Sequence, residues 1–233
     1  MPLRYDNPFA TPHSRLNMDI NPYAKQLLSG QIEGQVFHGP ALEGKKGHWR
    51  EVFDGGVNDE KTRKPLILEI GCHLGLVLRS MAKNHPEACF LGMDITYKRV
   101  VETAKRAARD GTPNIASLMA NASSLEKLFA PDEIDGVVIF FPDPWVKKKR
   151  QQKNRLLSKE FAGALYHCLS EGGFVWFKTD HRPYFDDAFE AFMAAGFRRK
   201  LKKNWLTASE YKSAFQEKFV SAGLPFFETV VEK

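Results

Sequence analysis

The sequence predicts an α/β fold: a doubly wound, mostly parallel sheet with helices on both faces. From residue 64 onward, short apolar strands alternate with amphipathic helices, and this spacing is typical of repeated strand–helix–strand units. The expected strands are apolar along their whole length, as strands of buried parallel sheets are. A chain of 233 residues, 43% of them hydrophobic, is long enough for one such domain with a modest extension.

Residues 1–60 are expected to form an N-terminal arm, and residues 61–233 are expected to form the folded domain. Several prolines interrupt the first 21 residues, which are therefore predicted to be irregular. A short helix is expected over 22–28, because Asn21 can cap it and a proline stands at its first position. The rest of the arm is expected to be loop, with one strand over 35–38.

Within the domain, apolar segments separated by glycine, proline and polar breaks define the expected elements. Strands are expected over 65–70, 88–94, 114–119, 135–141 and 174–180, with two closing strands over 196–200 and 225–231. Helices are expected over 76–84, 97–109, 123–129, 159–169 and 183–194. The apolar stripes of the first two helices place Leu76 and Ala108 among the residues that face the core. Gly172 and Gly173 are expected to separate the fourth helix from the strand that follows.

The formal net charge is +6 and the pI is about 9.1, so an anionic partner is expected. The basic excess is concentrated in residues 147–155 and 198–203. The cysteines, at positions 72, 89 and 168, lie in apolar segments without paired spacing, which predicts reduced core residues rather than a disulfide or metal framework. No long apolar span or signal peptide is visible, so we expect a cytoplasmic protein with neither a membrane nor a metal partner.

A glycine turn flanked by acids follows the first strand of the domain. Gly71 and Gly75 let the backbone approach a ligand, and Asp94, at the end of the next strand, can bind a ribose diol. The turn lacks the third glycine of dinucleotide-binding turns, and Glu69 would repel a diphosphate. Glu69 favours a cationic ligand, and S-adenosylmethionine, an adenosine that carries an amino acid and a sulfonium, fits this turn. The alternative is a tight turn with no ligand.

The strand over 135–141 runs into an acidic proline turn. Pro142 and Pro144 hold Asp143 at the carboxyl end of this strand, where open α/β sheets place their ligands. Trp145 adds a flat aromatic face, and a basic strip that attracts phosphate follows at once. The basic strip consists of Lys147, Lys148, Lys149, Arg150, Lys153 and Arg155. The alternatives are an ordinary turn, a core tryptophan and a solvated basic face.

Two more polar residues follow strands and have two interpretations each. Asn121 follows the strand over 114–119, where its side chain could hydrogen-bond an adenine or cap the next helix. Asp180 ends the strand next to that of Asp143, if the strand order is regular. It could therefore face the same pocket as Asp143, or it could cap the helix over 183–194.

These motifs together resemble the bacterial tRNA (guanine-N7)-methyltransferase family. The resemblance runs from about Leu66 to the C-terminus, and the segment Phe140-Phe141-Pro142-Asp143-Pro144-Trp145 is its most specific part. It implies a Rossmann-like sheet of the class I methyltransferase type, and methyl transfer from S-adenosylmethionine to a guanine in the tRNA variable loop. The residues it assigns to S-adenosylmethionine are Glu69, Gly71, Asp94, Asn121 and Asp143. It also implies that Asp143 is the catalytic acid. The residues it assigns to the substrate are Lys147, Asp180, Thr207 and Glu210.

Three features depart from the family pattern. Cys72-His73-Leu74 stands where a more glycine-rich turn is usual, and Asn121 stands where the family usually has Asp. The segment Thr207-Ala208-Ser209-Glu210 keeps only the ends of a Thr-x-x-Glu pattern. The first two departures predict an altered affinity for S-adenosylmethionine.

Three other functions are compatible with parts of this pattern. An amino-directed nucleic-acid methyltransferase also uses an acidic proline turn, but Asp143-Pro144-Trp145 meets its pattern only in part. A catalytically lapsed RNA-binding module of the same fold would explain the irregular glycine turn. A nicotinamide oxidoreductase is disfavoured, because the glycine pattern is incomplete. A monomer is expected, with a homodimer as the alternative.

Overall fold

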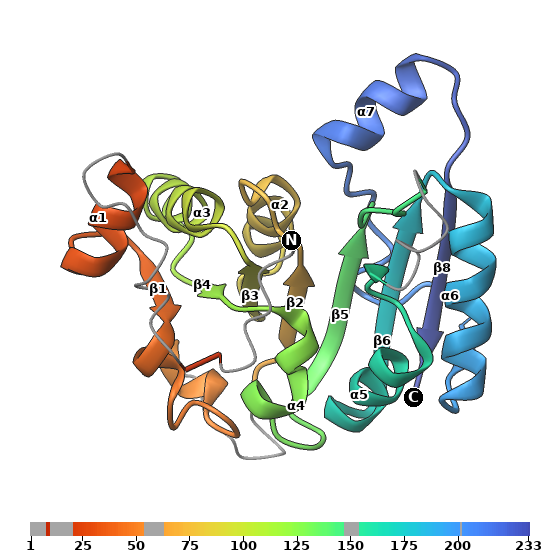
Figure 1. Cartoon of the computed structure of the whole chain (residues 1–233), viewed down its shortest axis with the longest axis horizontal. Coiled ribbons are helices and arrows are strands. Elements are labelled where there is room, and N and C mark those ends of the chain that lie inside the picture. The colour runs from red at the N-terminus through yellow and green to blue at the C-terminus, as the bar shows by residue number, and fades with distance from the viewer. Residues whose placement is uncertain (1–7, 10–20, 54–62, 147–153, 201) are drawn as a thin grey trace.

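The computed structural model describes residues 8–9, 21–53, 63–146, 154–200 and 202–233 (Figure 1). Within these ranges, eight strands form one sheet in the order β1-β4-β3-β2-β5-β6-β8-β7. The pairings that join β1 to β6 are parallel, whereas β8 pairs antiparallel with both β6 and β7. The mostly parallel sheet expected from the sequence is confirmed.

The strands form where apolar and β-branched residues are bounded by turn residues. In chain order they are β1 (Gln35–His38), β2 (Leu66–Ile70), β3 (Cys89–Asp94), β4 (Ile115–Met119), β5 (Ile134–Phe140), β6 (Leu169–Thr179), β7 (Arg198–Arg199) and β8 (Phe227–Glu232).

The helices connect these strands. The α-helices are α1 (Pro22–Ser29), α2 (Leu76–Asn84), α3 (Tyr97–Arg109), α4 (Leu125–Leu128), α5 (Lys159–Cys168), α6 (Arg182–Ala194) and α7 (Ala214–Ser221). Short 3₁₀-helices are η2 (Gly39–Leu42), η3 (Trp49–Val52) and η4 (Ala122–Ser124). As expected, Asn21 caps α1 by accepting hydrogen bonds from the N–H groups of Tyr23 and Ala24.

Helices cover both faces of the sheet (Figure 1). On β2, the side chain of Ile67 packs in a cluster with residues of α2, whereas Leu66 and Leu68 pack in a separate cluster with residues of α5 and α6. Side chains of one strand alternate between the faces, so β2 is buried on both sides. The doubly wound architecture is therefore confirmed.

The bounds of α2 and α3 match the prediction, but two of their inward-facing residues were predicted wrongly. Leu76 is 47% exposed, because Val77 and Leu78 take the buried positions of the first turn of α2. Ala108 is also exposed, since the buried stripe of α3 ends at Ala107. Apolar residues at the edge of a helical stripe thus lie in solvent in both helices.

The strand β6 begins earlier than expected, directly after α5. Gly172 adopts a φ of +72°, and the pairing with β5 shifts register between Ile134 and Gly136. A glycine in this conformation allows an irregularity inside a strand. The prediction that Gly172 and Gly173 separate helix from strand was therefore wrong.

The C-terminal part of the chain differs from the prediction in one more helix and in shorter closing elements. The helix α7 was not predicted, and β7 is limited to Arg198–Arg199. The helix expected over 123–129 is replaced by η4 and the four-residue α4. The closing strand β8 was predicted correctly in place, although it begins two residues and ends one residue later than expected.

The described part of the N-terminal arm packs on the domain. Its strand β1 pairs with β4 at the sheet edge. Trp49 is fully buried, and its backbone N–H donates to Oε1 of Glu133 at 3.0 Å. The buried guanidinium of Arg50 pairs with Asp135 at the start of β5. The boundary between arm and domain stays a prediction, but these residues share the domain's core.

The three cysteines are free and buried, as expected. Of the helices in the described ranges, none is long and apolar enough to cross a lipid bilayer. The same ranges hold no group of three or more His, Cys, Asp or Glu side chains that could bind a metal ion.

Candidate active site

The carboxyl ends of β2 and β5 lie side by side at the point where the strand order reverses. From β2 the chain winds through β3 and β4 in one direction, and from β5 through β6 in the other. Open α/β sheets bind ligands in the crevice outside such a switch point. Glu69 lies at this edge on β2, and Asp143 follows β5, so the sheet brings these two predicted residues to the same edge.

Glu69 is a buried acid with one oxygen that has no partner. The residue is 4% exposed, and its Oε2 makes no hydrogen bond within the described ranges. Burial raises the pKa of Glu69 to about 8, and the charge of Asp94 adds to this effect. The backbone N–H of Leu78, which donates to the carboxyl group, acts in the opposite direction. A cationic ligand would satisfy this carboxylate, since burying an unpaired charge is costly.

The turn after β2 is tight, although Cys72-His73-Leu74 stands where the family usually has glycines. His73 takes a φ of +51°, in the left-handed region that glycine favours and histidine tolerates better than most residues. At Gly75, with φ of +68°, an added Cβ would lie 2.6 Å from Cγ2 of Thr103. Around Gly71 an added Cβ would meet nothing within 4 Å. The turn thus keeps open space beside Gly71 and a glycine where α3 packs closest.

Asp94 ties β3 to this turn. Its carboxylate accepts hydrogen bonds from the backbone N–H groups of Thr96 at 3.0 Å and His73 at 3.3 Å, and it pairs with Arg99 at 3.4 Å. The Asp94 side chain is 2% exposed. A carboxylate has lone pairs for further donors, so binding of a ribose diol by Asp94 stays a prediction.

Asn121 acts as a helix cap. Its Oδ1 accepts the N–H of Ser123 at 3.0 Å and so caps η4. This contact supports the capping interpretation of Asn121, and its role toward an adenine stays a prediction.

Asp143 and Asp180 follow neighbouring parallel strands, β5 and β6, in which Phe140 is paired with Lys178. Neither carboxylate makes a hydrogen bond or ion pair with any other described residue, and Asp143 is exposed. His181, not Asp180, caps α6, because its Nδ1 accepts the N–H of Tyr184 at 3.1 Å. Within the described ranges the edge therefore presents two unpaired carboxylates, and the capping interpretation of Asp180 was wrong.

The acidic proline turn is flanked by two residues with unusual backbone angles. Phe141 and Trp145 have φ values of +53° and +49°. Non-glycine residues in this region cost free energy and persist only where neighbouring contacts hold them. At Phe141 these contacts are the hydrogen bond from its N–H to the carbonyl of Lys178 at 2.8 Å and a ring contact with Phe215 of α7 at 5.1 Å.

Arg155 anchors the acidic proline turn from the far side. Its Nε donates to the carbonyl of Pro144 at 2.9 Å, and its Nη1 pairs with Asp187 of α6 at 2.5 Å. The guanidinium also lies over the ring of Tyr184, 5.0 Å from its centroid. The side chain is only 8% exposed. A buried, bonded guanidinium is not available to a phosphate, so Arg155 does not belong with the solvated cations of the basic strip.

The other cations of the basic strip lie outside the described residues, and their phosphate contacts stay predictions. They are Lys147, Lys148, Lys149, Arg150 and Lys153.

Thr207 and Glu210 differ in exposure: Thr207 is buried, whereas Glu210 lies at the surface. Thr207 is 3% exposed, and its Oγ1 accepts the N–H of Asn204 at 2.8 Å. Asn204 in turn accepts the N–H of Thr207 at 2.8 Å, so the two residues lock a local turn. The Thr207 hydroxyl is engaged there, which argues against a substrate contact. Glu210 is exposed and pairs with Lys212 at 3.2 Å.

Three residues that shape this edge were missed by sequence reasoning. Thr103 of α3 donates from its hydroxyl to the carbonyl of His73 at 3.2 Å, and no local sequence pattern predicts this contact. Lys178 is buried, and a lysine directly after the apolar run of β6 could have raised suspicion. Ser213 caps α7 through the N–H of Gln216 at 3.1 Å, and this Ser-x-x-Gln spacing is a capping-box signature that predicts a helix start.

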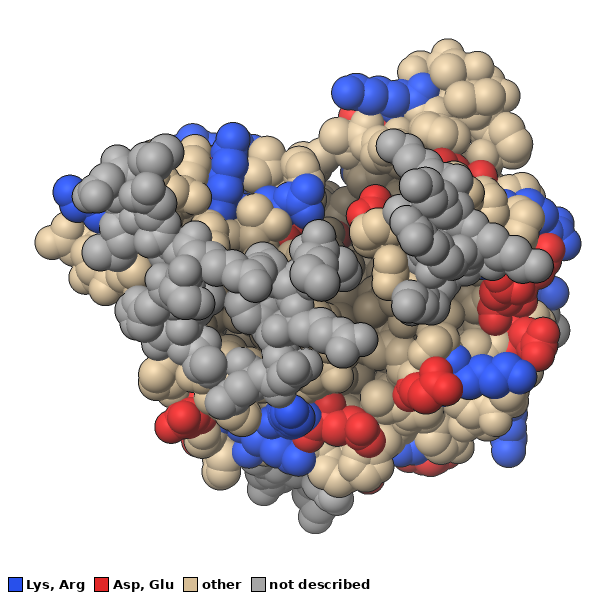
Figure 2. Space-filling model, in the orientation of Figure 1, with Lys and Arg blue, Asp and Glu red and all other residues tan. Residues whose placement is uncertain are grey.

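The charges around the site are distributed unevenly. The surface is hollowed between α2 and α7, above the ends of the parallel strands, and blue atoms gather over α2 and α3 on one side of the hollow (Figure 2). The cations of α3 are Lys98, Arg99, Lys105, Arg106 and Arg109. Acidic residues of α6, on the other side, are Asp186, Asp187 and Glu190. Each of these three acids is paired with a cation, Asp186 with Arg182, Asp187 with Arg155 and Glu190 with Lys159, so α3 carries the larger net positive charge of the two helices.

Comparison with known proteins gives consistent results. The family model described as "Putative methyltransferase" matches residues 63–229. The chain is 34% identical over 184 residues to a tRNA (guanine-N(7)-)-methyltransferase of Streptococcus mutans, covering 76% of this chain and 82% of that protein. It is 35% identical over 202 residues to the protein of the same name from Lachnoclostridium phytofermentans, covering 84% of this chain and 89% of that one.

Among solved structures, an antibiotic-related methyltransferase has a similar fold. The TM-score is 0.55 at 16% sequence identity, and the match covers 74% of this chain and 90% of that one. At this identity the likeness shows the fold alone. The doubly wound sheet is thus of the methyltransferase type, as expected.

Proposed function

The chain belongs to the bacterial tRNA (guanine-N(7)-)-methyltransferase family, and on this premise we propose that it transfers the methyl group of S-adenosylmethionine to N7 of a guanine in the tRNA variable loop. The family membership expected from the acidic proline turn is confirmed. The proposal concerns which residues of this chain perform each part of the reaction.

Two free carboxylates at neighbouring strand ends carry the proposal. Asp143 and Asp180 lie beside the switch point of the sheet and are not paired with any described cation. Carboxylates accept hydrogen bonds from the N1–H and exocyclic amino group of a guanine, and they offset positive charge. We assign Asp180, with Glu210, to the guanine edge and Asp143 to the reacting side of the base.

The residues at the end of β2 fit S-adenosylmethionine. S-adenosylmethionine would supply the methyl group on a sulfonium. Glu69 offers a buried carboxylate with an unpartnered oxygen to a cationic ligand, and the open space beside Gly71 lets the backbone approach it. In this proposal Asp94 receives the ribose, Asn121 the adenine, and Asp143 borders the same site.

Guanine N7 already carries an exposed lone pair, so the protein needs no general base. The chain's task is to hold N7 in line with the methyl group, and such positioning can contribute about 7–11 kcal/mol in favourable cases. Positive charge moves onto the purine ring during the transfer. Asp143 would then stabilise that charge rather than accept a proton.

The RNA backbone would be held by the basic strip. We propose that Lys147, next to the acidic proline turn, contacts the substrate, and that Lys148, Lys149, Arg150 and Lys153 contact phosphates. The buried Arg155 instead supports the turn. We propose the cytoplasm as the place of action, with a monomer as the acting species and no metal required.

Identification of the methylated nucleoside tests the proposal. The purified protein is incubated with unmodified tRNA and S-adenosylmethionine, and the tRNA is digested to nucleosides for mass spectrometry. We expect 7-methylguanosine, and none from a tRNA in which the guanine of the variable loop is replaced. A base methylated on its exocyclic amine would instead indicate an amino-directed methyltransferase. Binding of tRNA without thermal stabilisation by S-adenosylmethionine would indicate a lapsed RNA-binding module.

A further inference from the structure

Lys178 is a buried lysine at the carboxyl end of β6, two residues before Asp180. It is 2% exposed. Its ammonium group donates to the carbonyl of Tyr211 at 3.1 Å and to Oε1 of Gln216 at 3.3 Å. Its third neighbour is the carboxylate of Glu228 on β8, at 3.7 Å. An ammonium group has three donors, so polar partners surround it in three directions.

Aromatic rings enclose the rest of the ammonium group. Its nitrogen lies 4.4 Å from the ring centroid of Phe140, 4.7 Å from that of Trp176 and 5.9 Å from that of Phe226. Such contacts stabilise a cation more strongly when it is shielded from water. Burial lowers the pKa of Lys178, while the carboxylate of Glu228 opposes that effect. The site is thus built around a charge that folding took out of water.

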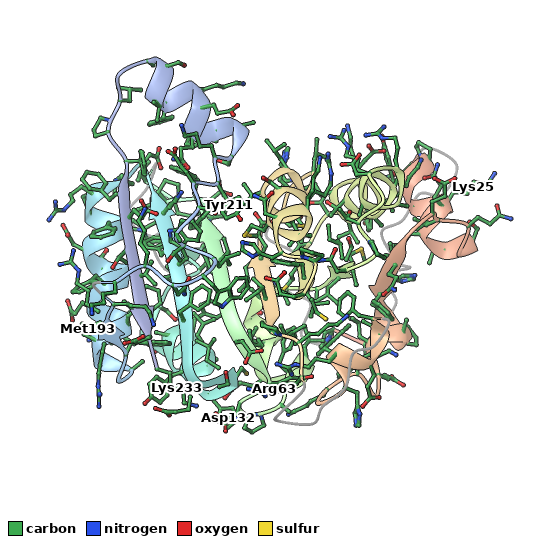
Figure 3. The ribbon with its side chains drawn as sticks, turned by 180° about the vertical axis from the view of Figure 1, so that it is seen from behind. Lys25, Arg63, Asp132, Met193, Tyr211 and Lys233 are labelled. Carbon is green, nitrogen blue, oxygen red and sulfur yellow. The ribbon has the colours of Figure 1, made fainter. Side chains whose placement is uncertain are left out.

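Two of the partners of Lys178 come from the part of the chain between β7 and β8: Tyr211 precedes α7, and Gln216 lies within it. Tyr211 is 2% exposed, and its hydroxyl contacts Nε2 of His85 at 3.0 Å, so its carbonyl and its ring tip are fixed by different elements. Figure 3 shows Tyr211 below α7, between β6 and α2. Gln216 is 1% exposed and lies in the first turn of α7. Lys178 therefore joins the end of β6 both to the residues before α7 and to α7 itself.

We propose that Lys178 is a positioning residue that fixes residues 204–221, the segment with α7, over the strand end that carries Asp180. Lys178 touches neither tRNA nor S-adenosylmethionine; it sets the place of the groups, such as Glu210, that face the RNA. The functional part of this inference rests on the proposed methylation of tRNA. The structural part does not, because it concerns contacts within the chain.

The test compares Lys178→Met with Lys25→Met, which makes the same change at an exposed lysine of α1. Amide hydrogen exchange is measured on the free proteins. In Lys178→Met we expect amides of 204–221 to exchange at least about tenfold faster, because the hydrogen bonds to Tyr211 and Gln216 no longer oppose local opening there. The Michaelis constant for tRNA should rise roughly tenfold with an unchanged dissociation constant for S-adenosylmethionine. Lys25→Met should match the wild type in every measurement.

A second variant covers the case in which Lys178→Met fails to fold. Gln216→Met removes the acceptor on α7 and leaves the Tyr211 carbonyl in place, so faster exchange should be confined to residues 214–221. Exchange equal to wild type over 204–221 in either variant would overturn the positioning role. Faster exchange with unchanged tRNA kinetics would overturn its link to function. If the wild type methylates no tRNA, the proposed function fails while the exchange data still decide the structural part.

Discussion

The two halves of the carboxyl edge of the sheet differ in the sign of the charge that they bury. On the β2–β3 side the acids Glu69 and Asp94 are buried, and Oε2 of Glu69 has no hydrogen-bond partner among the described residues. On the β5–β6 side Asp143 is exposed and Asp180 is half-buried, and neither is paired with another described residue, while the buried charges are the cations Lys178 and Arg155. The first half is suited to a small cation that leaves water on binding. The second half is suited to a large solvated partner. Its buried cations, Lys178 and Arg155, bind neighbouring segments of the chain.

The largest effect is expected from a substitution in the β5–β6 half of the edge. Asp143→Ala should lower the turnover number for tRNA methylation at least about a hundredfold, because it removes the charge that we propose stabilises the reacting base. Its melting temperature should stay close to that of the wild type, since Asp143 is exposed and unpaired. Asp132→Ala, which removes an acid paired with Lys233 elsewhere in the fold, is the control (Figure 3). Near-normal turnover of Asp143→Ala would rule out its assigned role.

The next effect tests the burial of Glu69. Its pKa rises from 4.5 to about 8 on folding, so the folded chain binds this proton more tightly than the unfolded chain. The contribution to stability is complete below about pH 4.5 and is lost as pH rises toward 8, by about 1.4 kcal/mol per pH unit. Urea unfolding between pH 5 and 8 should show this slope in the wild type and in Glu171→Gln, an exposed control, but not in Glu69→Gln.

The same residue should govern cofactor affinity. Glu69→Gln should weaken S-adenosylmethionine binding by roughly ten- to a hundredfold near pH 8, because a charged partner is lost. Affinity of the wild type should rise with pH up to about 8, since the cation binds the ionised carboxyl group. Isothermal titration calorimetry measures both, and tRNA affinity should not change. A parallel loss of tRNA binding would point to a folding defect instead.

The basic strip is tested by the salt dependence of tRNA binding. Replacing Lys148, Lys149 and Arg150 by Ala should weaken tRNA binding several-fold and flatten the plot of log K against log salt by about two units, at roughly 0.7 per phosphate contact. Affinity for S-adenosylmethionine should stay constant. Parallel plots of equal height for wild type and variant would mean that these cations form only a solvated face.

The smallest effect separates Arg155 from that strip. Arg155→Lys keeps the charge but cannot reach both Pro144 and Asp187, so turnover should fall about threefold while the salt dependence of tRNA binding is unchanged. Arg63→Lys, at an arginine paired with Asp135, is the matched control (Figure 3). A flatter salt plot for Arg155→Lys would show that Arg155 contacts phosphate after all.

Sequence reasoning worked best for the positions of acids near strand ends. Glu69, Asp94, Asp143 and Asp180 all stand at or just after the end of a strand that could be recognised from its apolar run. The positions of these acids follow from topology alone, since parallel strands end at one edge. The fold was therefore predictable, and so was the gathering of these acids at one edge of the sheet.

What could not be predicted depends on contacts between distant parts of the chain. Arg155 looks like one more cation of a basic run, and only its contact with Asp187, on another helix, shows that it is buried. Thr207 matches one end of a Thr-x-x-Glu pattern, yet its hydroxyl is used by its own turn. Residue type and spacing state what a side chain can do, whereas tertiary packing decides whether it is free to do it.

The two outer strands of the sheet bear on how the chain behaves at high concentration. A strand at a sheet edge carries unpaired backbone groups on which a second chain can add a strand of its own. Here the outermost strands are β1, with four residues, and β7, with two. β7 is formed by two exposed arginines, whose positive charges would repel the same arginines of a second copy of the chain. Both borders are thus poor templates for intermolecular strand pairing, so we expect the chain to resist aggregation through its sheet edges at high concentration.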